Sequence, residues 1–151
     1  KIANEFESRP AIDACYGDLI YVSRQDLTAV VRKYSSASFS PDRMKFGAMC
    51  PHPTFYLRSS AQAKLGNYKI DYRAAADFEF MARFLERGHI AGRIDYPLVK
   101  MRMGGISTTG LRWIIHQNFE IVRACQENGI RTNIFFIALK IPSKLLGYLF
   151  R

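Results

Sequence analysis

The chain has 151 residues, about the size of one domain. Its 22 Lys and Arg residues outnumber its 13 Asp and Glu residues, and the net charge is +9. Apolar residues make up 48% of the chain, with only 10 Gly and 6 Pro, which excludes disordered and collagen-like classes. The three cysteines, Cys15, Cys50 and Cys125, are too far apart in sequence for a zinc knuckle or a redox pair. We therefore expect free thiols in a reducing compartment.

The first third of the chain predicts the end of a helix followed by strands. Residues 14–23 are rich in Tyr, Ile and Val and predict a strand. A turn at residues 25–26 then leads to residues 27–34, the expected hairpin partner. A short helix is expected over residues 40–46, because its Pro stands near the first helical position.

Two prolines flank His52 in the middle of the chain. Each proline favours extended geometry in the residue before it, so we expect His52 in a stiff loop. That loop leads into a predicted strand over residues 54–57. Ser59 and Ser60 are expected to cap a short helix that ends at Gly66.

The clearest predicted helix precedes Gly88. Apolar residues recur there at helical spacing, and Gly88 follows the last turn. These apolar residues are Phe78, Met81, Phe84 and Leu85. Two short strands are expected next, over residues 91–94 and 98–103.

A long helix is expected to open at Ser107-Thr108-Thr109 and to continue to about Asn128, where Gly129 stops it. Asn118 interrupts the side of this helix that is expected to be apolar. The apolar members of that side are Leu111, Ile114, Ile115, Phe119 and Val122. The whole pattern predicts a mixed α/β chain with strands early and helices late.

Basic residues dominate the last part of the chain. Residues 111–151 hold six Lys or Arg and two Glu. The longest apolar run there, residues 134–139, is too short to span a bilayer. Two interpretations remain for residues 132–151: a peripheral contact with an anionic membrane, or a terminal helix docked on protein and broken at Pro142. The chain contains no nucleic-acid recognition motif, so nucleic acid is not an expected partner.

Asp77 is the first candidate for chemistry, at the start of a predicted helix. One interpretation is that it caps free N–H groups, since a carboxylate is favoured at a helix N-terminus. The other is that it acts as a general base beside a cleft. Glu79 lies two residues further on and points to a different side of the helix, so the two acids are not expected to form an acid/base pair.

His52 is the second candidate, either as a binding residue in its stiff loop or as a histidine bonded to backbone. The third is the segment 100–107, where a strand end and a Gly pair precede Ser107 at a helix start. Backbone N–H groups there suit a phosphate, and Arg102 adds a bidentate donor. The chain has no Walker sequence, no GxGxxG, GxSxG or HExxH motif, and no DxD.

Four sequence blocks follow one another in a distinctive order. They are YGDLIYV (16–22), RMKFGAMCPHPTFYLR (43–58), KLGNYKIDYRAAADFEFMARFLERG (64–88) and YPLVKMRMGGIS (96–107). Over residues 10–110 this series resembles the C-terminal half of bacterial family 2 glycosyltransferases. Those are inverting enzymes with the GT-A fold that assemble colanic acid, O-antigen and other exopolysaccharides.

The resemblance implies roles for individual residues. Asp77 matches the position of the catalytic base, and His52 and Thr54 match a block on the acceptor side of the cleft. Arg102 and Ser107 match the block near the nucleotide diphosphate. Some members of the family have a His in that last block where this chain has Met and Gly, so we expect no metal ligand in this chain.

The resemblance also implies the activity of a whole enzyme. That enzyme would transfer a sugar from a nucleotide-sugar donor to a saccharide or lipid-linked acceptor, with inversion and with a divalent metal, Mg or Mn. The metal ligands would lie mostly outside this chain, because the family's nucleotide-binding half and its DxD are missing here. We therefore expect a truncated domain, inactive alone, from a cytoplasmic protein at the inner face of the cell membrane.

The expected fold is α/β: a partial GT-A-like domain with a short mixed sheet, flanking helices and a C-terminal helical tail. Residues 1–110 would form the acceptor-side part and residues 111–151 the basic tail. An unpaired sheet edge in such a half-domain favours a homodimer. The alternative function is a non-catalytic basic module that binds an anionic membrane or a partner chain.

Overall fold

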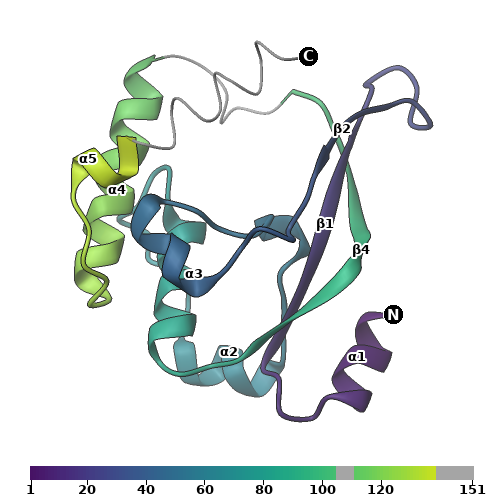
Figure 1. The fold of residues 1–151 in the computed structure, drawn as a ribbon, viewed down its shortest axis with the longest axis horizontal. Coiled ribbons are helices and arrows are strands. Elements are labelled where there is room, and N and C mark those ends of the chain that lie inside the picture. Colours follow the sequence, from purple (N-terminus) through teal and green to yellow (C-terminus); the bar gives the residue numbers. More distant parts are fainter. Residues whose placement is uncertain (105–110, 139–151) are drawn as a thin grey trace. The chain divides into compact units, whose positions relative to one another are not determined.

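The computed structural model describes residues 1–104 and 111–138, and these residues form a mixed α/β structure, as expected (Figure 1). The chain divides into two compact units. Unit 1 comprises residues 1–39, 50–67 and 87–108, and unit 2 comprises residues 40–49, 68–86 and 109–151. Residues 40–49 and 68–86 group with the C-terminal helices rather than with the sheet. The expected division into residues 1–110 and 111–151 stays a prediction.

Unit 1 is organised around β1 (Ala14–Val22), which lies at the centre of a four-stranded mixed sheet. β2 (Val30–Tyr34) and β3 (Tyr56–Leu57) pair with β1 in antiparallel orientation, and β4 (Ala91–Arg102) pairs with it in parallel. The predicted hairpin of residues 14–34 is confirmed. Among the described strands β2 and β4 each pair with β1 alone, so each has one open edge.

β4 corrects the prediction of two short strands, because it runs without interruption from Ala91 to Arg102. The expected break coincides with a bulge: Tyr16 pairs with Arg93, but Asp18 pairs with Pro97. A Cβ on Gly17 would lie 2.6 Å from the carbonyl oxygen of Tyr96, so only glycine allows this close approach.

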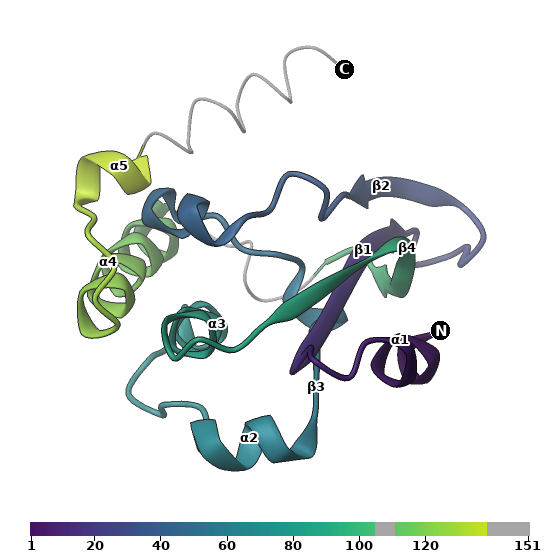
Figure 2. The same ribbon diagram turned by 60° about the horizontal axis from the view of Figure 1, so that its bottom comes forward.

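Two short helices, α1 (Ile2–Ser8) and α2 (Ser59–Leu65), lie near the end of the sheet where β3 pairs with β1 (Figure 2). Arg58 ties them together, since its guanidinium donates to the carbonyl of Phe6 at 2.6 Å and to that of Ile12 at 2.8 Å. The predicted helix after residue 58 is confirmed, but no side chain caps it; Arg58 itself is the N-cap residue.

Unit 2 is helical in its described part. It contains η1 (Pro41–Phe46), α3 (Ala76–Glu86), α4 (Leu111–Glu127) and α5 (Ile134–Ala138). The short helix predicted over residues 40–46 is a 3-10 helix. α3 supplies the core with large side chains that are almost fully buried: Phe78, Phe80, Met81 and Phe84. Gly129 follows α4 with a φ of 78°, which explains why the helix stops there.

The buried side of α4 is not the predicted one. Ile115 and Phe119 are exposed, at 47% and 59%, whereas Asn118, Ile121 and Cys125 are buried. The prediction was wrong because this helix turns polar residues toward the protein, where they bind a loop. The predicted helix start at residues 107–109 and the side chain of Leu111 lie outside the described residues.

The predicted tail is described only as far as residue 138. Residues 134–138 form α5, in which Ile137 is buried. The ring of Phe136 packs edge-on against that of Phe46 in η1, with the two centroids 5.6 Å apart. Residues 139–151 lie outside the described residues. No described helix combines the length and the apolar character that crossing a membrane requires.

Candidate functional site

Asp77 lies in the first turn of α3 with its side chain half-buried. Its Oδ1 accepts a hydrogen bond from the N–H of Phe78 at 2.8 Å. Among the described residues Oδ2 has no hydrogen-bond partner, and no cation pairs with this carboxylate. Both interpretations of Asp77 therefore fit: one oxygen serves the helix N-terminus, and the other is open.

The segment before α3, residues 68–75, is here called the pre-α3 loop. Its last three residues donate their N–H groups to the carboxylate of Glu120 on α4, at 2.8 Å from Arg73, 2.7 Å from Ala74 and 2.9 Å from Ala75. Burial raises the pKa of Glu120, but these three hydrogen bonds outweigh it and hold the pKa below its usual value. A carboxylate from another helix thus fixes the start of α3 two residues before Asp77.

A second anchor binds the pre-α3 loop to the end of α4. Glu127 accepts hydrogen bonds from Lys69 at 2.7 Å and from the hydroxyl of Tyr72 at 2.9 Å. Arg123 bonds to the other oxygen of Glu127 at 2.7 Å and also pairs with Asp71. The hydrogen bond from Lys69, together with those from Arg123 and Tyr72, lowers the pKa of Glu127 to about 2. The loop is therefore bound to α4 along most of its length.

Glu79, two residues after Asp77, is buried in the core of unit 2. Its fully buried carboxylate receives two bonds from Arg83, at 3.1 and 3.0 Å, and lies 3.1 Å from Lys69 Nζ. Burial raises the pKa of Glu79, but the hydrogen bonds from Arg83 and Lys69 outweigh this effect. The net pKa lies below the usual value, so Glu79 stays ionised. This geometry agrees with the expectation that Asp77 and Glu79 do not form an acid/base pair.

Tyr68 is a neighbour of Asp77 that the sequence did not single out. Its ring stacks on Phe80 with centroids 4.4 Å apart. Burial raises the pKa of the Tyr68 phenol, and the negative charge of Asp77 raises it further. The phenol therefore stays neutral and lies close enough to sense the charge of Asp77. An aromatic residue shortly before the predicted helix was the only available signal.

Thr54 and His52 lie in unit 1, in the single 3-10 turn η2 (His52–Thr54). Thr54 is fully buried, and its hydroxyl lies 2.9 Å from the carbonyl of Gly17 and 2.7 Å from that of Pro51. It also accepts the N–H of Gly17 at 3.2 Å. The side chain of Thr54 therefore holds this turn against β1, while His52 is half-buried. The strand predicted over 54–57 is shorter, because residues 52–54 form the turn.

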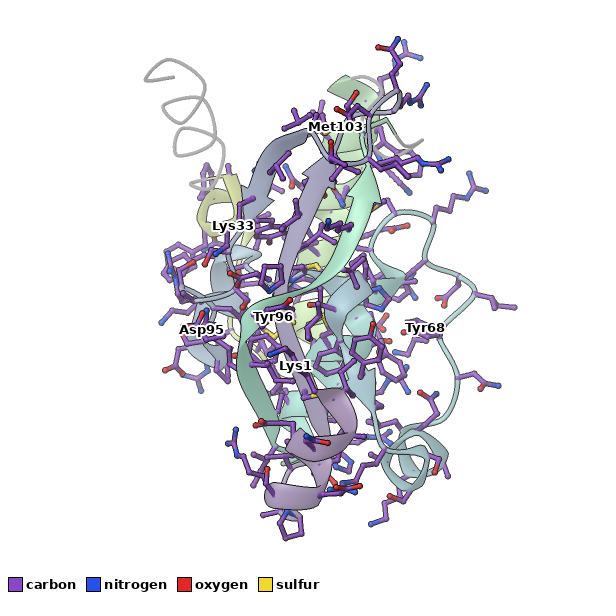
Figure 3. The ribbon with its side chains drawn as sticks, turned by 90° about the vertical axis from the view of Figure 1, so that its right-hand side faces the viewer. Lys1, Lys33, Tyr68, Asp95, Tyr96 and Met103 are labelled. Atoms are coloured by element: carbon purple, nitrogen blue, oxygen red, sulfur yellow. The ribbon has the colours of Figure 1, made fainter. Side chains whose placement is uncertain are left out.

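Arg102 is exposed at the carboxyl end of β4, paired with Val22 of β1. Ser107 lies outside the described residues. A residue missed in the sequence, Arg24, binds the segment that follows β4: it donates to the carbonyls of Met103 at 2.7 Å and Gly104 at 3.0 Å. Figure 3 labels Met103 in this segment. Two carbonyls of the predicted phosphate-binding segment are therefore already occupied by a cation of the protein.

Asp18 is the buried acid of unit 1, 1% exposed in the middle of β1. It accepts the N–H and the hydroxyl of Ser36, both at 2.8 Å, and pairs with Lys33 at 2.9 Å and with Arg93 at 3.6 Å. Burial raises its pKa, but the hydrogen bonds from Ser36 and Lys33 bring it down to about 2. Lys33 is labelled in Figure 3. A charged residue inside a run of apolar strand residues was the signal in the sequence.

The four predicted site residues that the structure describes fall into different units. Asp77 belongs to unit 2, whereas His52, Thr54 and Arg102 belong to unit 1. The described residues contain no group of three or more His, Cys, Asp or Glu side chains that could hold a metal ion. None of the cysteines forms a disulfide, and burial raises the pKa of both the Cys15 and the Cys50 thiol, which disfavours a thiolate nucleophile.

Comparisons with known proteins assign no family to this chain. A scan against protein-family models gives no match, and a search of curated proteins gives none either. What distinguishes the site is its geometry: a carboxylate with one open oxygen, at the start of a helix whose preceding loop is bound tightly to a second helix.

Proposed function

We propose that this chain is the acceptor-side, base-carrying part of an inverting glycosyltransferase. The single observation that supports this most directly is the open carboxylate oxygen of Asp77 at the anchored start of α3. The other acids near it in unit 2 are already engaged: Glu79 by Arg83, and Glu120 by three backbone N–H groups. Asp77 is thus the acid in this neighbourhood that can accept a proton from a ligand.

In the proposed reaction Asp77 takes the proton of an acceptor hydroxyl as that oxygen attacks the anomeric carbon of a nucleotide sugar. The new bond forms between the acceptor oxygen and the anomeric carbon. The bond from that carbon to the phosphate oxygen breaks, and its electron pair leaves with the nucleoside diphosphate. Attack from the face opposite the leaving group inverts the configuration. A general base at hydrogen-bond distance contributes about 10²–10⁴ to such a rate.

The surroundings of Asp77 suit this role. No cation among the described residues competes for its open oxygen, and the helix N-terminus favours its negative charge. The bonds from Arg73, Ala74 and Ala75 to Glu120 restrict the loop that positions it. A base held in place needs little ordering when the acceptor binds.

The unit 1 residues keep their expected roles in this proposal. By the resemblance, His52 would serve the acceptor; Thr54 holds the turn of His52 against β1. Arg102, with Ser107, serves the diphosphate by charge and hydrogen bonds. When bound, Mg or Mn would neutralise the leaving phosphates. By the resemblance, its ligands would lie mostly outside this chain.

The test is Asp77→Asn in the intact enzyme. The Asn amide oxygen still accepts the N–H of Phe78, so the circular dichroism spectrum should not change. We expect sugar transfer to fall by about 10²–10⁴. Asp42→Asn is the matched control, because Asp42 is also an acid in the first turn of a helix in unit 2 but is exposed. Undiminished transfer by Asp77→Asn would remove Asp77 from the mechanism.

The second candidate function is a binding module, and the exposed apolar residues of unit 2 favour it. Phe135 on α5 is 78% exposed, and Ile115 and Phe119 on α4 are exposed as well. Such residues are typical of a surface that contacts a partner chain or an anionic membrane. This function predicts that deletion of residues 132–151 weakens sedimentation with anionic vesicles, while Asp77→Asn leaves binding unchanged.

A further inference from the structure

An open hollow of about 390 Å³ lies in unit 2 beside the pre-α3 loop. Its lining residues come from that loop and from α4: Asp71, Arg73, His116, Phe119, Glu120 and Arg123. Its volume falls in the range of small-molecule sites, about 300–1,000 Å³. We propose that this hollow binds a pyranose ring of the acceptor saccharide, an inference that rests on the function proposed for Asp77.

The polar wall of the hollow is fixed before any ligand binds. Glu120 is buried and holds three loop N–H groups, and the Nε2 atom of His116 lies 3.0 Å from its carboxylate. Arg123 is held between Asp71 and Glu127. Side chains that are already ordered lose little entropy on binding, which favours recognition of a small ligand by an open site.

Phe119 gives the hollow an apolar surface. Its side chain is 59% exposed on α4, one turn after His116 and one turn before Arg123. A pyranose has an apolar C–H face that packs against an aromatic ring and removes both from water. An exposed aromatic ring among charged side chains therefore matches the two-sided character of a sugar.

The charged lining residues suit the hydroxyl edge of the same ring. The side chain of Arg73 has no hydrogen-bond or ion-pair partner among the described residues, so its donors are open to a ligand. Asp71 also lines the hollow, and its carboxylate can accept hydrogen bonds through the oxygen that does not pair with Arg123. Hydroxyl groups donate and accept, so they satisfy both kinds of partner, which a purely apolar ligand cannot do.

Arg73 belongs both to the hollow and to the loop that leads to the proposed base. It lies four residues before Asp77, and its N–H is fixed on Glu120, which lines the hollow. A sugar held against Phe119 and Arg73 would thus bind within the same unit as Asp77. The hollow would select which acceptor saccharide presents its hydroxyl to the base.

The test uses this chain and three probes: methyl β-D-glucopyranoside, methyl β-D-galactopyranoside and methyl β-D-glucuronide. Amide shifts in ¹⁵N-labelled protein should change saturably at Arg73, His116 and Phe119 with at least one probe. The single tryptophan, Trp113, gives an independent fluorescence signal, because its ring centroid lies 6.4 Å from that of His116. No saturable change with any of the three probes would overturn the proposal.

Phe119→Ala should weaken binding roughly tenfold, the loss expected for one aromatic contact. Ile115→Ala is the matched control: Ile115 is exposed on the same helix, 47% against 59%, but does not line the hollow. Equal affinities of the two variants would contradict the proposal. Arg73→Met, which keeps the backbone N–H bonded to Glu120, should also weaken binding.

The outcomes separate this inference from the proposed function. Saturable binding that Phe119→Ala weakens, together with normal transfer by Asp77→Asn, would support the hollow as a sugar site and reject the base. Absence of binding together with loss of transfer in Asp77→Asn would keep the base and reject the hollow.

Discussion

Asp18 in unit 1 and Glu120 in unit 2 are both buried acids, but different groups bind them. In unit 1 Asp18 accepts hydrogen bonds from Ser36 and pairs with two cations of neighbouring strands, Lys33 of β2 and Arg93 of β4. In unit 2 Glu120 binds backbone N–H groups and so fixes a loop. The partners of Asp18 leave it no room to bind a ligand. The contacts of Glu120 instead hold the loop before Asp77, whose second carboxylate oxygen is open. Buried charge therefore joins strands in one unit and fixes the loop before Asp77, the proposed base, in the other.

The largest effect is expected for Asp18→Ala. Removing this carboxylate leaves the N–H of Ser36 and the cations of Lys33 and Arg93 without their buried partner. We expect the free energy of unfolding to fall by about 3–5 kcal/mol, measured by urea denaturation. Asp18→Asn is the comparison, since it keeps an acceptor oxygen and should cost less. A loss below that of Glu120→Ala would reverse the contrast between the units.

Glu120→Ala should lower the free energy of unfolding less than Asp18→Ala does, but it should lower the activity more. It removes the acceptor of three loop N–H groups, two of which are only part-buried, so water can replace part of it and we expect a loss of about 1–3 kcal/mol. Under the proposed function, kcat of the intact enzyme should fall while the KM for the nucleotide sugar stays the same, because the mutation releases the loop before Asp77. Glu120→Gln keeps one acceptor oxygen and should recover part of kcat. A change confined to stability would leave Glu120 with a purely structural role.

The loss of stability at acid pH should test the buried acid of unit 1, Asp18, and the loop anchor of unit 2, Glu127, in one experiment. The pKa values of Asp18 and Glu127 are both about 2, below the ordinary values for Asp and Glu. Their contribution to stability is therefore complete above the unfolded-state pKa, near 4, and is lost as the pH falls toward 2. For Asp18 the loss is about 2 kcal/mol. Urea denaturation from pH 6 to pH 2 should show this decline, and Asp18→Asn should flatten it; an unchanged slope would contradict the assignment.

Local patterns predicted most elements of this fold, because helix spacing, glycines and prolines act over a few residues. The helix that ends before Gly88 and the hairpin at residues 14–34 are examples. Residues 95–97 were expected to break a strand, but pairing with β1 absorbs them as a bulge. The buried side of α4 could not be predicted, because Glu120 is turned inward by backbone groups 45–47 residues away. The position of Asp77 was predictable from its helix start, whereas its open oxygen depends on contacts that sequence spacing does not reveal.

The smallest effect is expected for Lys33→Met. The ammonium of Lys33 lies 2.9 Å from Asp18, but its side chain is 56% exposed, so water screens the pair. Asp18 also keeps the N–H and the hydroxyl of Ser36 as partners when Lys33 is removed. We therefore expect a loss of about 0–1 kcal/mol in the free energy of unfolding, against several for Asp18→Ala. A loss from Lys33→Met as large as that from Asp18→Ala would mean that the ion pair, rather than the hydrogen bonds of Ser36, stabilises the buried acid. The contrast between the units would then rest on charge neutralisation alone.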